Sequence, residues 1–204
     1  VTVRSMSAAY ATFANNGVYR EARTFTKVYN GKGEVVLSNA QDSRQILSEK
    51  AVTYMNYCLE NVVKAGTGTA AQIGGQVVAG KTGSTTSNRD RWFCGYTKYY
   101  TAAVWFGFDT PEVVNLIMGN GNNPAAILFS KVLSKVHTGL PKVDLVNYNK
   151  MTWTSVCLDS GKAPTEACLL DVRTEGGLKR TDSALVYPED KVTGACDKHI
   201  AVDY

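Results

Sequence analysis

Residues 77–86 read Val-Val-Ala-Gly-Lys-Thr-Gly-Ser-Thr-Thr, an apolar run followed by a lysine and a group of hydroxyl side chains. The run Val77–Ala79 predicts a short buried strand. Gly80 and Gly83 flank Lys81-Thr82, and because glycine has no side chain, another group can approach the backbone closely there. We interpret this segment as part of a site for a small polar ligand.

Length and composition indicate one globular domain followed by a tail. The chain has 204 residues, of which 44% are hydrophobic and 20% charged, which is enough to bury one sizeable core and too apolar for disorder. Its 22 basic and 18 acidic residues give a net charge of +4 without a dense basic run, so nucleic-acid binding is not expected. No segment reaches the roughly 18 apolar residues that a membrane span requires.

The region before residues 77–86 predicts a helix, a hairpin and a second helix. Asn15-Asn16-Gly17 should end the first helix, which is expected to pack through an apolar face. That face contains Met6, Ala9, Tyr10, Phe13 and Ala14. Residues 24–29 and 34–37 flank Asn30-Gly31-Lys32-Gly33 and predict a β-hairpin on the surface.

The second helix is expected to begin after Ser48, its N-cap, and to reach Lys64 before Gly66 ends it. Its expected apolar side contains Val52, Met55, Leu59 and Val62. Cys58 falls within this stripe and is interpreted as a small buried core residue.

After residues 77–86, the sequence predicts a polar turn at residues 87–90 and strands at 92–97 and 101–109. Together they predict an antiparallel meander. Trp92, Phe93 and Tyr96 are interpreted as packing residues. Arg89 and Asp90, in the turn, are expected to contact either substrate or each other.

A third helix is expected to start at Asn123-Pro124 and to continue through Leu128, Val132 and Val136. His137 at its end is interpreted as a C-terminal capping residue. Periodicity fades from Gly139 onward, so we expect a main domain over 1–138 and a linker with a small tail over 139–204.

Four segments together carry a family resemblance. Residues 5–19, 66–70, 80–84 and 90–96 occur in the order and spacing seen in class A penicillin-binding proteins, and the resemblance covers about residues 1–137. Lys81-Thr82-Gly83 resembles the third motif of penicillin-binding proteins and serine β-lactamases. The resemblance implies an α+β fold of the β-lactamase/transpeptidase type, an antiparallel sheet flanked by helices, with the N-terminal half of the domain missing.

The reaction that the resemblance implies is acyl transfer from D-Ala-D-Ala stem peptides to an amine of a neighbouring peptide. Lys81, Thr82 and Ser84 would bind the terminal carboxylate of the donor, and the Ser84 backbone N–H would stabilise the oxyanion. Gly83 would leave room for the substrate backbone, and Thr85 would complete the substrate-binding set. Lys81 and Ser84 are therefore the expected catalytic residues, and no metal or cofactor is expected.

Two difficulties accompany this assignment. Strand pleating places Lys81 and Gly83 on one side and Thr82 and Ser84 on the other, so we expect the strand to border the cleft. The 204 residues also contain neither Ser-x-x-Lys nor Ser-x-Asn, the first and second motifs of the family. We therefore expect that the chain alone is inactive and that the nucleophile, a glycosyltransferase domain and a membrane anchor precede Val1.

The resemblance implies a location on the extracytoplasmic face of the bacterial membrane and recognition of β-lactam antibiotics as well as stem peptides. Two alternatives stay open. A β-lactamase or DD-carboxypeptidase of the same fold would hydrolyse the acyl group, and a non-catalytic penicillin-sensing or wall-binding module would bind without turnover.

The tail carries Ser160-Gly161-Lys162, three cysteines and His199, and it resembles the tail that follows the transpeptidase domain in some class A enzymes. A single disulfide between Cys157 and Cys168 is the simplest hypothesis. Zinc bound by Cys157, Cys168, Cys196 and His199 is the alternative, although the spacings are irregular for a standard zinc ribbon.

Overall fold

The computed structural model describes residues 1–114, 123–171 and 179–199, and the chain divides into two compact units, Val1–Val146 and Asn147–Tyr204. The division falls after Val146 and not after residue 138, because the intervening segment packs on the first unit. Leu145 joins the buried cluster around Tyr96, and the Tyr99 hydroxyl donates to the Pro141 carbonyl over 2.9 Å. No helix in the described ranges is long and apolar enough to span a membrane.

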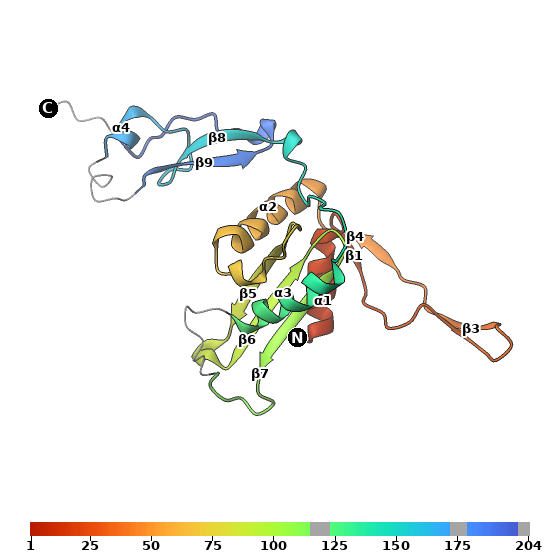
Figure 1. The fold of residues 1–204 in the computed structure, drawn as a ribbon. Helices are drawn as coiled ribbons and strands as arrows, with labels where there is room; N and C mark the ends of the chain where they lie inside the picture. Colours follow the sequence, from red (N-terminus) through yellow and green to blue (C-terminus); the bar gives the residue numbers. More distant parts are fainter. Residues whose placement is uncertain (115–122, 172–178, 200–204) are drawn as a thin grey trace. The chain divides into compact units, whose positions relative to one another are not determined.

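The first unit is built on a three-stranded sheet, with β5 (Ala79–Ser84), β6 (Asp90–Tyr96) and β7 (Thr101–Gly107) in the order β5-β6-β7 (Figure 1). Both pairings are antiparallel, which confirms the predicted meander and the α+β class. Within the described part of this sheet, β5 is an edge strand.

The first helix, α1 (Val3–Ala14), ends as predicted, with Asn15 as its C-cap and with positive φ angles of 52° at Asn16 and 87° at Gly17. Left-handed backbone suits both residue types and stops a helix. Tyr10 and Phe13 pack against the buried Tyr96 ring. Ala9, expected on the packing face, is exposed instead.

The second helix, α2 (Glu49–Ala65), has the predicted caps: the Ser48 hydroxyl accepts from the Ala51 N–H over 3.2 Å, and Gly66 is the C-cap. Val52 and Leu59 are buried as predicted, whereas Val62 is only half-buried. Met55 is 41% exposed and Cys58 is also exposed, so the interpretation of Cys58 as a buried core residue is wrong. This side of the helix forms the wall of an open groove.

The third helix, α3 (Pro124–Val136), begins after Asn123, whose side-chain oxygen accepts from the Ala125 N–H over 2.9 Å. The predicted apolar stripe through Leu128 and Val132 is about half exposed, at 48% and 49%, so it is not the packing face. The buried face contains Ala125, Ala126, Phe129 and Leu133. This face packs against the sheet, where the Phe129 ring meets the Phe93 ring at a centroid distance of 4.8 Å.

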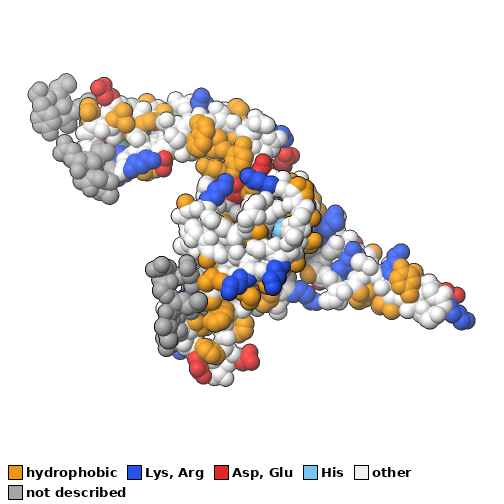
Figure 2. Space-filling view, in the orientation of Figure 1, with side chains coloured by type: hydrophobic (Ala, Val, Ile, Leu, Met, Phe, Trp, Pro, Cys, Tyr) orange, Lys and Arg blue, Asp and Glu red, His pale blue; other side chains and the backbone are white. Residues whose placement is uncertain are grey.

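Two small sheets complete the first unit. β1 (Val18–Arg20) pairs with β4 (Ser43–Gln45), and β2 (Lys27–Tyr29) pairs with β3 (Val35–Ser38). The β2–β3 pair is the predicted hairpin, and every residue of its two strands is exposed. Hydrophobic and charged side chains both lie on the surface seen in the space-filling view (Figure 2). Short 3₁₀ turns occur at Thr69–Ala71, Thr86–Asn88, Tyr148–Lys150 and Pro188–Asp190.

The described residues of the second unit form one strand pair, one short helix and two of the 3₁₀ turns named above. β8 (Thr152–Cys157) pairs antiparallel with β9 (Thr181–Val186), and α4 spans Glu166–Leu169. The buried hydrophobic cluster found in its described part consists of Cys157, Cys168 and Cys196. Large apolar side chains such as Trp153 and Leu169 are exposed, so the thiols take the place that aliphatic residues usually fill.

Candidate functional site

Lys81 lies on the wall of an apolar groove of about 760 Å³ between α1, α2 and β5. The other walls include Tyr10, Phe13, Met55, Leu59 and Val62. Lys81 is the charged residue among the residues that line the groove, and its Nζ donates to the Thr82 carbonyl over 3.1 Å. A single ammonium group beside apolar walls provides a receptor for an anionic ligand group.

The hydroxyl of Thr82 lies on the other face of β5. Thr82 is opposite Phe93 in the sheet, whereas Lys81 is opposite Cys94, so the structure does not bring the Lys81 and Thr82 side chains onto one face. The Thr82 hydroxyl lies 2.8 Å from the Thr67 hydroxyl. Thr67 is a contact that the sequence reasoning missed, although the Gly66-Thr67-Gly68 turn at the end of α2 offered a signal.

Gly83 and Ser84 occupy the exposed end of β5. Gly83 is opposite Trp92, and a Cβ added at Gly83 would lie 3.2 Å from the Trp92 Cβ. Ser84 is exposed. Among the residues that the structure describes, Trp92 alone would lie within 4 Å of a Cβ at position 83, so the end of the strand has open surface on the side of Lys81.

The connection between β5 and β6 is held by Asp90. The Thr85 hydroxyl donates to the Asp90 carboxylate over 2.9 Å and accepts from the Asp90 N–H over 2.9 Å, while the Trp105 indole N–H donates to the other carboxylate oxygen over 2.8 Å. The hydroxyl of Thr85, expected in the substrate-binding set, is thus engaged within the turn. Asp90 contacts Thr85 and Trp105.

Replacing Asp90 by alanine is expected to lower the free energy of unfolding by about 1–3 kcal/mol, because a half-buried indole N–H and a hydroxyl lose their acceptor. The thermal midpoint of the chain measures this loss, and Asp109→Ala, in the exposed segment after β7, is the control. A variant with normal stability and lost ligand binding would instead assign Asp90 to the substrate.

Two buried groups behind the groove serve packing. Burial raises the pKa of Cys94 to about 11, so this thiol is neutral and is a poor nucleophile. Burial, followed by the nearby Glu60 and Tyr10, also raises the pKa of Tyr96. The Tyr96 hydroxyl donates to the Asn56 side-chain oxygen over 2.6 Å, which links the sheet to α2.

His137 is the C-cap residue of α3 and is buried. Its Nδ1 lies 2.6 Å from the Leu133 carbonyl oxygen and its Nε2 lies 2.8 Å from the Thr97 hydroxyl. Both ring nitrogens therefore have structural partners, and the imidazole ties the end of the helix to the β6–β7 turn.

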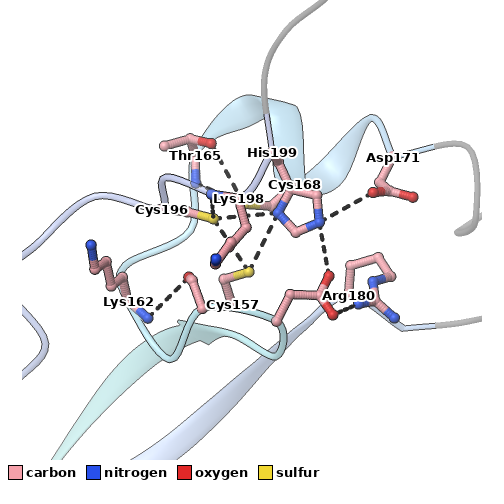
Figure 3. A network of polar contacts seen from close by, with 11 residues as sticks. Cys157, Lys162, Thr165, Cys168, Asp171, Arg180, Cys196, Lys198 and His199 are labelled. Carbon is pink, nitrogen blue, oxygen red and sulfur yellow. Dashed lines mark hydrogen bonds and ion pairs between the residues drawn. The ribbon is translucent and has the colours of Figure 1, made fainter.

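In the second unit, Cys157, Cys168, Cys196 and His199 converge, and one ligand atom from each lies within 4.8 Å of the others (Figure 3). All the cysteines carry free thiols. The predicted Cys157–Cys168 disulfide is therefore wrong. The His199 side chain is only 5% exposed.

Comparison with known proteins relates the chain to penicillin-binding proteins, both by a family model and by similar sequences. A family model described as "Penicillin binding protein transpeptidase domain" matches residues 1–134. The chain is 33% identical over 170 residues to penicillin-binding protein 1A of Clostridium perfringens, and 36% identical over 169 residues to that of Clostridium botulinum. These matches cover 83% and 82% of the chain but 20% of each relative, so the chain spans about a fifth of their length.

Solved structures agree in fold. The penicillin-binding protein PonA1 of Mycobacterium tuberculosis matches with a TM-score of 0.61 and 25% identity, over 70% of this chain and 40% of that one. Penicillin-binding protein 1A of Haemophilus influenzae matches with a TM-score of 0.67 and 14% identity, over 96% of this chain and 33% of that one.

Proposed function

The chain belongs to the penicillin-binding protein transpeptidase family, and on that premise we propose that it forms one wall of the active site of a peptidoglycan DD-transpeptidase. The observation that carries the proposal is the position of Lys81, the charged group on the wall of an apolar groove beside an edge strand. An edge strand can pair with an extended peptide, which suits a stem peptide as substrate.

In the proposed reaction a serine attacks the carbonyl of the D-Ala-D-Ala bond, D-alanine leaves, and the acyl group passes to an amine of a second stem peptide. Lys81 binds the terminal carboxylate of the donor, and the N–H of Ser84 stabilises the oxyanion. Gly83 leaves the surface beside β5 open. A β-lactam enters as an analogue of the same peptide and acylates the same serine.

The nucleophile is proposed to come from a part of the protein outside these 204 residues, which contain no Ser-x-x-Lys and no Ser-x-Asn. The apolar groove beside Lys81 suits a helix that would bring the serine next to the lysine. Because the relatives named above are penicillin-binding proteins 1A, we also assign the complete protein to class A, with a glycosyltransferase domain, a membrane anchor and an extracytoplasmic location.

The experiment compares the 204-residue chain with the complete protein. We expect the complete protein to bind a fluorescent penicillin covalently and to release D-alanine from a stem pentapeptide, and we expect the chain alone to do neither. Lys81→Ala in the complete protein should reduce both activities. A complete protein in which Lys81→Ala leaves both unchanged would contradict the proposed role of this strand.

The same assay separates a sensing module and a β-lactamase from the transpeptidase, and transfer of the acyl group to an added amine acceptor separates the transpeptidase from a DD-carboxypeptidase. Penicillin binding without D-alanine release would indicate a sensing module, and rapid hydrolysis of the bound penicillin would indicate a β-lactamase. The relatives named above are penicillin-binding proteins, which favours the transpeptidase.

A further inference from the structure

Three thiols and one imidazole meet in the interior of the second unit, and we propose that they bind one structural zinc ion. Cys157 ends β8, Cys168 lies in α4, and Cys196 and His199 lie in the loop after β9. All three cysteine side chains are buried. Three thiolates and one imidazole form a common closed ligand set for structural zinc.

The distances suit a tetrahedral ion. Zn–S bonds of about 2.3 Å and Zn–N bonds of about 2.0–2.1 Å separate two sulfurs by about 3.8 Å, and a sulfur from a nitrogen by about 3.6 Å. The Cys196 and Cys157 sulfurs lie 3.5 Å apart, and the His199 Nδ1 lies 3.3 Å and 3.5 Å from them. All four ligand atoms lie within 4.8 Å of one another, so shifts of at most about 1 Å would place them around one ion.

The imidazole is oriented for this role. Its Nε2 lies 2.9 Å from a carboxylate oxygen of Asp159 and 3.1 Å from one of Asp171, so the Nε2–H donates to a carboxylate and Nδ1 presents its lone pair to the sulfurs (Figure 3). Arg180 pairs with Asp159 and holds it in place. Zinc-binding histidines commonly donate their second N–H to a carboxylate in this manner.

Backbone contacts fix two of the sulfurs. The Lys198 N–H donates to the Cys196 sulfur over 3.4 Å, and the Thr165 N–H donates to the Cys168 sulfur over 3.3 Å. Such contacts stabilise a thiolate, the form that binds metal. An isolated parallel bridge between Ala163 and Ala195 brings the loop with Cys196 beside the turn that follows Cys157.

The composition of the interior of the second unit also favours a bound metal. The second unit has only 58 residues over Asn147–Tyr204, and its described core cluster contains cysteines alone. Units of this size commonly need a metal or disulfides to be stable. A disulfide would join two of the three thiols and would not involve the third thiol or the Nδ1 of His199, whereas zinc uses all four groups.

The test measures zinc in the full 204-residue chain after incubation with Zn²⁺ and removal of unbound metal. We expect about one zinc per chain, and with Co²⁺ instead, the visible absorption of tetrahedral thiolate ligation. Cys196→Ser should abolish both signals. Cys58→Ser, at an exposed thiol outside the cluster, is the matched control and should change neither.

A second variant leaves every ligand in place, so the proposal does not depend on a variant that fails to fold. Asp171→Asn removes one carboxylate acceptor of His199 and should weaken zinc binding by about 10–100-fold in competition with a chelator. Asp182→Asn is the control, because Asp182 pairs with Lys179 on the surface of the same unit.

Alkylation of the native chain separates zinc from a disulfide. In the zinc form, the three clustered thiols should be protected and should react once a chelator is added. Less than about a tenth of a zinc per chain after loading, or thiols that react only after a reductant is added, would overturn the proposal.

Discussion

Gly83→Val in the complete protein is expected to lower the rate of acylation by fluorescent penicillin by at least about 100-fold, because a displacement of about 1 Å in a bound substrate is enough for such a loss. Gly83 follows Thr82 on the edge strand β5. The two methyl groups of valine would occupy the open surface beside the strand, where we place the backbone of the stem peptide.

The structure allows this variant to fold. A Cβ at position 83 would lie 3.2 Å from the Trp92 Cβ, a contact that a shift of a few tenths of an ångström relieves. Gly31→Val is the matched control, because an added Cβ there meets nothing within 4 Å. An unchanged acylation rate in a folded Gly83→Val protein would show that the substrate does not lie along β5.

Phe93→Ala is expected to lower the free energy of unfolding by about 3–5 kcal/mol, the usual range for a buried phenylalanine. The Phe93 side chain is 0% exposed and packs against Phe129 in the larger core cluster. The buried position of the Phe93 ring requires glycine at positions 80 and 95, because a Cβ on either residue would approach the ring to 2.5 Å. The glycine pair makes room for this ring.

Thermal or urea unfolding followed by circular dichroism measures the change. Phe106→Ala is the matched control, since Phe106 lies in the neighbouring strand β7 but is 43% exposed, and we expect it to cost less than about 1 kcal/mol. Equal losses for the two variants would contradict the assignment of Phe93 to the core.

Many elements could be predicted because their signals are local. Asn16-Gly17 ended α1, Ser48 and Gly66 bounded α2, and Asn123-Pro124 began α3, as expected. Cap and turn residues act through their own backbone and that of residues three or four positions away. The spacing of apolar residues also distinguished helices from strands, because the side-chain period of each is a local property of the backbone.

The packing faces were harder to predict. In α3 apolar residues lie on more than one side, and the buried side contains Phe129 instead of the predicted stripe through Leu128. The position of Phe93 in the sheet decided between them. In α2, Cys58 faces the groove instead of the core, and no pattern within the helix distinguishes these two surroundings.

The family, the order of the elements and the strand that carries Lys81 follow from the sequence, because motif, caps and periodicity are read along the chain. The buried faces of the helices, the contact between Thr67 and Thr82, and the shared interior of three thiols and His199 depend on the packing of the folded chain. Cys157 and His199 are 42 residues apart, and contacts over such separations depend on how distant segments pack, which local sequence does not encode.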